Sequence, residues 1–230
     1  MDQHSQEWRD ARCGKVTASR VGDLMARNQP RKGNTVGEWS ARHNNYLEEK
    51  IAERITGKPR DRKKVASLAY RLELEPDARI AYEFYFNRDV VQVGFIEHPR
   101  IPNFGASPDG LVGSDGGQEI KCLDPETHIG LIRAGGVDQD YIYQCQTGMA
   151  CTDRKWWEFV AYCPEMPEEG KLWVQRIERD DAVIADIETN VIEFLTEVDR
   201  AVQEVQLLLR GSSPLEHALQ NSLSALHLVH

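Results

Sequence analysis

The chain has 230 residues, 40% of them hydrophobic, and carries a formal net charge of −9. Its length suits one domain with a core of its own, no apolar run is long enough to span a bilayer, and the first residues lack the apolar segment of a signal peptide. The five cysteines include no Cys-x-x-Cys pair, so the sequence predicts neither a disulfide framework nor a zinc or iron–sulfur site. We therefore expect a cytoplasmic protein with no membrane partner, built as one domain over residues 1–210 with a tail over residues 211–230.

The N-terminal segment is predicted to begin with two short helices. One is expected over residues 4–12 around Trp8, and the second begins at Thr17-Ala18-Ser19, where apolar residues follow at helical spacing. Residues 27–35 are polar and contain one proline and one glycine, a composition typical of a loop.

Two longer amphipathic patterns follow. They predict helices over residues 36–55 and 65–86, separated by Gly57 and a basic run over residues 58–64. In the second helix, Pro76 marks a break or a new first turn, because proline lacks the N–H that a helix interior requires.

Strand patterns dominate the middle of the chain. The sequence predicts strands over residues 90–93, 95–97, 110–112, 118–121, 155–162 and 172–177. A helix is predicted over residues 138–151, and Asp180 or Asp181 begins a long helix that ends near Leu209. Together these elements predict an α/β fold in which a central mixed sheet is flanked by helices.

The tail after Gly211 carries leucines at a weak helical spacing. They are Leu215, Leu219, Leu223 and Leu226. Such a stripe could contact a partner or another subunit, and a disordered or artificially added tail would fit the same residues.

The charged residues are distributed unevenly along the chain. Residues 1–64 contain 15 Lys/Arg and 9 Asp/Glu, whereas residues 65–230 contain 13 and 28. This asymmetry allows a basic surface on an acidic body, so the negative net charge does not exclude a nucleic-acid partner. Charges spread evenly over a solvated surface would give the same counts.

The sequence Ser107-Pro108-Asp109-Gly110, followed by Glu119-Ile120-Lys121, is the strongest chemical signal. If residues 118–121 form a strand, Glu119 and Lys121 leave the same face and Ile120 leaves the other. The turn signal at residues 113–117 predicts a hairpin that returns Asp109 toward Glu119. Two carboxylates offer oxygen ligands, which suit Mg²⁺ or Mn²⁺ better than they suit zinc.

These residue types suit the hydrolysis of a phosphodiester. Asp109 could bridge two cations, Glu119 could bind one of them, and the backbone carbonyl of Ile120 could add a third oxygen. Lys121 could orient or deprotonate the attacking water, or neutralise charge on the phosphate. A simpler interpretation stays open: Pro108-Asp109-Gly110 could only shape a turn, and Glu119 and Lys121 could form an exposed ion pair.

A candidate phosphate site lies near the N-terminus. The start of a helix presents free backbone N–H groups, Ser19 could donate a hydroxyl, and Arg12 could bind two phosphate oxygens at once. Ordinary helix capping by Thr17 or Ser19, with Arg12 in a surface ion pair, would explain the same residues.

Three further residues are candidates on predicted helices. Glu75 could hold a water molecule near a metal, and Gln144 could orient a water or contact a phosphate. Tyr141 lies three residues before Gln144, on the same helix face. Each could equally belong to a solvated helix surface.

These motifs occur in an order that resembles one family. The matching residues are Trp8, Arg12, Thr17-Ala18-Ser19, Glu75-Pro76-Asp77-Ala78-Arg79, Ser107-Pro108-Asp109-Gly110, Glu119-Ile120-Lys121 and Tyr141-x-x-Gln144-x-Gln146. Over residues 5–180 the chain resembles the phage lambda exonuclease family, also described as YqaJ-type viral recombinases. One departure is Arg71, which stands where the family usually has a glycine four residues before the helix glutamate.

The resemblance implies a restriction-endonuclease-like core and an enzyme. Family members digest one strand of linear double-stranded DNA in the 5′→3′ direction, leaving 3′ single strands for recombination. They use Mg²⁺, and we expect two ions per site with Mn²⁺ able to substitute. The best-known member is a ring-shaped homotrimer that works with a single-strand annealing protein. This chain is then expected to be encoded by a phage or prophage and to act in the bacterial cytoplasm.

The resemblance also implies roles for particular residues. The catalytic set maps to Asp109, Glu119, Lys121, Glu75 and Gln144; the metal ligands to Asp109, Glu119 and the Ile120 carbonyl; and the 5′-phosphate pocket to Arg12 and Ser19. Thr17, Trp8 and Tyr141 are added as DNA-binding candidates. Two alternatives stay open: an endonuclease on the same core, and a non-catalytic clamp that binds DNA ends and recruits an annealing protein.

Overall fold

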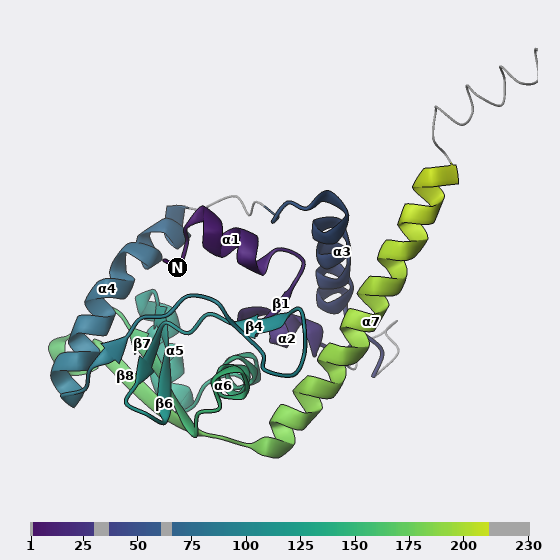
Figure 1. Ribbon diagram of the computed structural model, residues 1–230. Helices are drawn as coiled ribbons and strands as arrows, with labels where there is room; N and C mark the ends of the chain where they lie inside the picture. The colour runs from purple at the N-terminus through teal and green to yellow at the C-terminus, as the bar shows by residue number, and fades with distance from the viewer. Residues whose placement is uncertain (1, 30–36, 61–65, 212–230) are drawn as a thin grey trace, which may run out of the picture.

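The computed structural model describes residues 2–29, 37–60 and 66–211 (Figure 1). The predicted tail lies almost entirely outside these residues, as do part of the predicted loop over residues 27–35 and part of the basic run over residues 58–64.

The N-terminal elements largely follow the predicted pattern. They are α1 (Gln6–Arg12), β1 (Val16–Thr17), the 3-10 helix η1 (Ala18–Arg20), α2 (Val21–Leu24) and α3 (Ala41–Thr56). The Ser5 hydroxyl caps α1 by accepting a hydrogen bond from the Trp8 N–H at 3.1 Å. The helix predicted from residue 36 begins at Ala41 instead. Residues 38–40 are extended because their backbone pairs with residues 26–28.

The helix predicted over residues 65–86 is α4 (Ala66–Phe86), and Pro76 lies inside it. The prediction of a break or a new first turn at Pro76 is therefore wrong. Proline removes one hydrogen bond from a helix interior, but the next turns of α4 are fixed by packing. Ala78 and Tyr82 are fully buried against the sheet, and this contact keeps the helix continuous.

The strands form a mixed five-stranded sheet in the order β2-β5-β6-β7-β8. They are β2 (Val90–Val91), β5 (Gly110–Val112), β6 (Gly116–Cys122), β7 (Trp156–Tyr162) and β8 (Leu172–Glu178). β6 and β7 are parallel, and the other pairs are antiparallel. The predicted hairpin is confirmed, because β5 and β6 pair from Gly110 opposite Gln118 to Val112 opposite Gly116.

A smaller sheet has the order β1-β4-β3. β4 (Phe104–Ala106) lies between β1, which is parallel to it, and β3 (Ile96–Glu97), which is antiparallel. Neither β1 nor β4 was predicted, because two or three residues are too few to show an alternating pattern. β4 leads directly into residues 107–109, so this sheet connects the N-terminal segment to the hairpin.

Helices cover both faces of the five-stranded sheet. α4 packs on one face with Ile120 and Val160, and α6 (Gln139–Thr152) packs on the other with Trp157 and Phe159. Figure 1 shows α4 along one side of the molecule and α7 (Asp181–Gly211) along the other, and α7 packs on α3. The predicted fold class is confirmed: the protein is α/β, with a mixed sheet flanked by helices.

One helix was missed in the sequence analysis, namely α5 (Pro125–Ala134). Its signals are present: Asp124 caps the helix by accepting a hydrogen bond from the Thr127 N–H at 2.9 Å, Pro125 occupies its first turn, and Gly135 ends it in the left-handed conformation. Among the residues that the structure describes, no helix has the length and apolar character needed to cross a membrane.

Candidate active site

Strand alternation gives β6 one polar face. Glu119 and Lys121 leave the strand on the side of α6, whereas Ile120 packs in the core beneath α4. The two charged side chains form an ion pair, and the Gln144 amide on α6 donates a hydrogen bond to the same Glu119 oxygen. The predicted arrangement of these three residues is therefore present.

Asp109 reaches the same place through the hairpin. It directly precedes β5, and its Oδ2 accepts a hydrogen bond from the Ile120 N–H at 2.6 Å. This contact fixes the carboxylate beside the backbone of β6, at the residue that lies between Glu119 and Lys121 in the sequence. Asp109 is thus more than a turn former, and the simpler interpretation of Pro108-Asp109-Gly110 does not account for this contact.

The carboxylates of the site are difficult to ionise. Burial raises the pKa of Glu119 to about 7, and the nearby Asp109 adds to this shift while Lys121 and Gln144 oppose it. Burial raises the pKa of Asp109 to about 6, with Lys121 opposing and Glu75 adding to the change. The pKa of Glu75 is also raised, first by burial and then by Glu119. The nearby cations Lys121 and Arg79 oppose these shifts, but the effect of burial outweighs them.

Lys121 responds in the opposite sense. Burial alone would lower its pKa, but the carboxylates of Glu119 and Asp109 raise the pKa above its ordinary value. Its ammonium group also lies 5.9 Å from the centre of the Tyr141 ring. Lys121 is therefore a charged donor at neutral pH.

A second group of side chains lies on the N-terminal segment. The Arg12 guanidinium lies 3.9 Å from the centre of the Trp8 ring, and the Ser107 hydroxyl accepts hydrogen bonds from Trp8 Nε1 at 2.9 Å and Arg12 Nη1 at 3.1 Å. Burial lowers the pKa of Arg12 to about 10, while Tyr46 and Glu119 oppose the change. Arg12 is thus a half-buried cation that is held by Trp8 and Ser107 rather than by a surface ion pair.

Thr17 and Ser19 lie where the two sheets meet. Thr17 ends β1 and makes no side-chain capping bond, and Ser19 lies within the 3-10 helix η1. The predicted helix start is present, but the helix that begins there is the 3-10 helix η1, with Thr17 as its N-cap residue, and the α-helix α2 begins only at Val21. Capping by the Thr17 side chain is not supported.

One cavity of about 440 Å³ is lined by the whole predicted set. From the sequence analysis, its lining includes Trp8, Arg12, Thr17, Ser19, Glu75, Asp109, Glu119, Ile120, Lys121, Tyr141 and Gln144. The cavity thus brings together residues from α1, η1, α4, β6 and α6. The two most distant of these residues, Trp8 and Gln144, are more than 100 residues apart in the sequence. Arg71 lies within α4, but its side chain is outside the described residues.

Comparison with known proteins places the chain in a family. Residues 7–155 match the YqaJ-like viral recombinase domain. The chain belongs to this family. The resemblance drawn from the sequence motifs is thereby confirmed.

Solved structures show the same architecture as this YqaJ-like chain. It is 42% identical to the alkaline exonuclease LHK-Exo from Laribacter hongkongensis, with a TM-score of 0.81 over 90% of this chain and 99% of that chain. A phage-related exonuclease from Haemophilus somnus 129PT shares the fold at 14% identity, with a TM-score of 0.63 over 83% of this chain and 96% of that chain. The core is accordingly the restriction-endonuclease-like core that was predicted.

A protein named ExoD from Escherichia coli (strain K12) is similar over a shorter stretch. The two are 34% identical over 76 residues, which make up 32% of this chain and 86% of ExoD.

The donor atoms of the YqaJ-like site can be compared with the needs of a metal ion. Over residues 2–29, 37–60 and 66–211, no group of three or more His, Cys, Asp or Glu side chains is arranged to hold a metal. The candidate set is smaller: two carboxylates, Asp109 and Glu119, and the carbonyl of Ile120. These are hard oxygen donors, and a divalent cation would stabilise the ionised form of the two carboxylates, whose pKa values are raised mainly by burial. The donor set therefore fits Mg²⁺ or Mn²⁺.

Sequence reasoning assigned no role to Ser107, although it quoted the residue as part of a motif. Its hydroxyl joins Trp8 to Arg12, and it stands two residues before Asp109. The signal that could have revealed it is this short spacing, because a residue so close to Asp109 must share its cavity. Ser107 connects the two halves of the site.

Proposed function

We propose that the chain is a metal-dependent exodeoxyribonuclease that digests one strand of linear double-stranded DNA from its 5′-phosphorylated end. The observation that carries this proposal is the convergence of Asp109, Glu119 and Lys121 in the cavity that also contains Arg12 and Ser107. The 42% identity to an alkaline exonuclease over 99% of that protein supports it.

Asp109, Glu119 and the Ile120 carbonyl would hold the metal. A divalent cation there would stabilise the attacking and leaving oxygens of an in-line displacement at phosphorus. The Gln144 amide keeps the Glu119 carboxylate in one orientation through its hydrogen bond. Lys121 is protonated at neutral pH, so it would orient the attacking water and neutralise charge on the phosphate in preference to acting as a base.

Arg12 would determine which strand is cut. A guanidinium can donate two hydrogen bonds to one phosphate, and a terminal phosphate offers more negative charge than an internal linkage. If the 5′-phosphate binds beside Arg12, Ser19 and Ser107, the first linkage of that strand extends toward Asp109 and Glu119. Cleavage there would release the 5′ nucleotide and leave a 3′ single strand.

The biological setting belongs to the same proposal. The family is described as viral recombinases, which supports a role in recombination, encoded by a phage or prophage and carried out in the bacterial cytoplasm. We propose that the chain acts as a ring-shaped homotrimer with a single-strand annealing protein. A ring would explain how an acidic chain retains DNA through many cycles. Light scattering in solution tests the trimer, and co-purification with the annealing protein tests the partner.

The activity is tested with three DNA substrates. Linear duplex with a 5′-phosphate, linear duplex with a 5′-hydroxyl and closed circular DNA are each incubated with the protein in Mg²⁺ and in EDTA. We expect nucleotides to be released from the 5′ end of the phosphorylated duplex, only when metal is present. Cutting of the closed circle would favour an endonuclease, and end binding without nucleotide release would favour a non-catalytic clamp.

A further inference from the structure

The inward face of α3 is polar, which is unusual for a buried helix face. Tyr46, Glu49, Lys50, Glu53 and Arg54 follow the spacing that places residues on one side of a helix. Glu49, Lys50 and Glu53 are only 8%, 5% and 6% exposed. Burying charged groups is costly unless they are paired and hydrogen-bonded, so the contacts of this face indicate what it is for.

The first contact is with the turn that follows α1. The Glu53 carboxylate accepts a hydrogen bond from the Gly14 N–H at 2.9 Å, and Arg54 Nε donates to the Gly14 carbonyl at 2.9 Å. Gly14 has a φ of +69°, and a Cβ there would lie 2.8 Å from Arg54 Cγ. Only glycine fits this turn without strain. Gly14 lies two residues after Arg12, and α3 therefore holds both the N–H and the carbonyl of this glycine.

The second contact is with the end of β1. The Thr17 N–H donates a hydrogen bond to the Tyr46 hydroxyl at 3.2 Å. Three residues later, the Arg20 guanidinium lies 4.4 Å from the centre of the Tyr46 ring and 3.3 Å from the Glu49 carboxylate. The same helix face thus holds the chain on both sides of the Thr17–Ser19 segment.

Glu53 contacts several groups besides the Gly14 turn. Besides Gly14, its carboxylate accepts a hydrogen bond from the Arg60 N–H at 3.1 Å and forms a buried ion pair with Lys50. It is also one of the negative groups that oppose the lowered pKa of Arg12, after burial, Tyr46 and Glu119. Glu53 therefore contributes both to the path of the backbone and to the charge around Arg12.

We propose that the polar face of α3 positions the segment that recognises the terminal 5′-phosphate, and that Glu53 is its main positioning residue. This inference rests on the proposed function, because it takes Arg12 and Ser19 as the phosphate site. Glu53 does not line the cavity. It acts through the backbone of Gly14 and the charge of Arg12, so its effect should appear in end selectivity.

The test compares the binding of two duplexes that differ only at the 5′ end. Fluorescence anisotropy in Ca²⁺, a cation chosen to allow binding without cleavage, gives the ratio of dissociation constants for 5′-hydroxyl and 5′-phosphate ends. Glu53→Gln keeps the shape of the side chain and removes its charge. We expect this variant to lower the ratio by about three- to tenfold, the effect of one displaced hydrogen bond.

The matched control is Glu48→Gln, which removes the same charge from an exposed position on the same helix. It should leave the ratio unchanged. Arg12→Ala should abolish the preference for a 5′-phosphate, and adding Glu53→Gln to it should lower the ratio no further, because Glu53 acts through the Arg12 segment. A residue with only a general structural role would weaken binding of both duplexes in every background.

Thermal unfolding shows whether Glu53→Gln still folds. If it does not fold, Tyr46→Phe is tested instead, since it removes only the hydroxyl that accepts the hydrogen bond from the Thr17 N–H. A lowered ratio of the two dissociation constants in this variant supports the inference, and an unchanged ratio overturns it. A folded Glu53→Gln that keeps the full preference also overturns it, as does a wild-type protein that binds both ends equally. End selectivity that depends on Glu53 in a protein without nuclease activity would refute the proposed function and leave the inference standing.

Discussion

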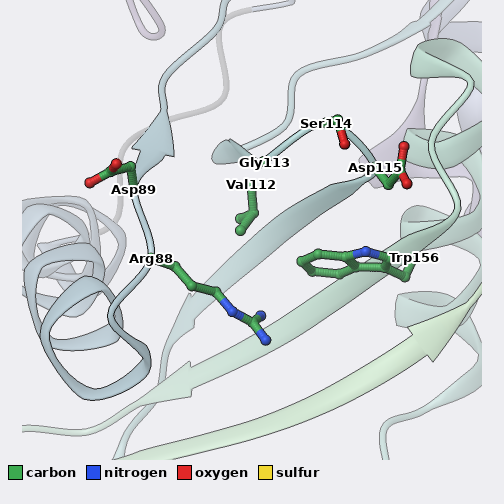
Figure 2. Close-up of a pocket in the computed structure, with 7 residues that line it drawn as sticks. All are labelled: Arg88, Asp89, Val112, Gly113, Ser114, Asp115 and Trp156. Carbon is green, nitrogen blue, oxygen red and sulfur yellow. The ribbon is translucent and has the colours of Figure 1, made fainter.

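The two ends of the β5–β6 hairpin each border a cavity, and the two cavities have almost the same volume. The cavity near Asp109 measures about 440 Å³, and the one beside the turn at residues 113–115 measures about 430 Å³. Figure 2 shows the second cavity, where the side chain of Arg88 and the ring of Trp156 lie below Val112, and Ser114 and Asp115 lie on the turn. Volume therefore does not distinguish them.

The two cavities differ in how their charged side chains are paired. At the turn, Arg88 donates to both oxygens of Glu158, at 2.8 and 2.7 Å, and Asp115 pairs with Lys155 at 3.1 Å. The hydrogen bond to Glu158 raises the pKa of Arg88, which stabilises its charged form. At the other end, burial raises the pKa values of Asp109 and Glu119, and a neighbouring carboxylate adds to each shift, Glu75 for Asp109 and Asp109 for Glu119. Burial thus disfavours the ionised carboxylates near Asp109, where a bound cation would stabilise them, whereas the ion pair at the turn stabilises the charge of Arg88.

The largest expected effect comes from replacing the charged side chains at the Asp109 end. Asp109→Asn and Lys121→Ala should each lower the rate of nucleotide release by about 10²- to 10³-fold or more, because both groups act on charge that develops in the transition state. The rate is measured on 5′-phosphorylated duplex at saturating Mg²⁺.

The matched control for this comparison is Asp115→Asn, on the same hairpin. Its ion pair with Lys155 is exposed, so the rate should stay within about twofold and the free energy of unfolding within about 0.5 kcal/mol of wild type. Equal losses of activity from Asp115→Asn and Asp109→Asn would refute the distinction between the two ends.

The next effect concerns pH and the metal-free protein. Asp109 and Glu119 have pKa values of about 6 and 7 in the folded state, against ordinary values of 3.8 and 4.5. Between about pH 4 and pH 7 the unfolded chain therefore binds fewer protons than the folded chain, so the free energy of unfolding should fall as pH rises, and then level off. Urea titrations in EDTA measure it.

Two changes should reduce that pH dependence. Asp109→Asn removes one of the two carboxyls, and Mg²⁺ at high concentration stabilises the ionised carboxylates in the folded state. If stability in EDTA rises over the same pH range, or Asp109→Asn leaves the slope unaltered, the pKa values of these two carboxyls are not raised in the folded protein.

The third effect tests the paired end directly. Arg88→Met should lower the free energy of unfolding by about 2 kcal/mol, because Glu158 is 4% exposed and would lose its cation. Arg88 is 34% exposed on its side chain, so water replaces part of the lost interaction. Cleavage per folded molecule should stay within about twofold. A large loss of activity in folded Arg88→Met would show that the second cavity takes part in catalysis.

Local sequence patterns explain how much of this comparison could be predicted. Alternation placed Glu119 and Lys121 on one face, and the turn residues placed Asp109 beside them, because both rules act over fewer than fifteen residues. The family resemblance, and not any local rule, identified Arg12 as part of the same site. What joins Arg12 to Asp109 is the pairing of β1 with β4, which no short pattern could reveal.

The polar face of α3 shows a different limit. In the sequence, Glu49, Lys50 and Glu53 resemble the solvated side of an amphipathic helix. They are buried because the N-terminal segment packs on them: Glu53 accepts from the Gly14 N–H and Glu49 pairs with Arg20, both far away in the chain. Lys50 lies between these two carboxylates and pairs with both. Whether a charged side chain is buried depends on what packs against it, so the sequence alone predicts that these three residues are exposed. By contrast, α5 carried ordinary capping signals and could have been found.

The last prediction concerns stability alone and tests how the paired end of the hairpin is packed. A Cβ on Gly116 would lie 2.0 Å from Cζ2 of Trp156, so the indole ring occupies the space that a side chain would need. Gly116→Ala should therefore lower the free energy of unfolding by about 1–3 kcal/mol through overpacking. Gly130→Ala is the matched control, since no atom lies within 4 Å of its added Cβ and alanine favours the helix by about 0.5–1 kcal/mol. Urea titrations at one pH should show opposite signs for the two variants. If Gly116→Ala were as stable as Gly130→Ala, the Trp156 ring would have to move away from the added methyl group at no cost, and the turn would not be tightly packed.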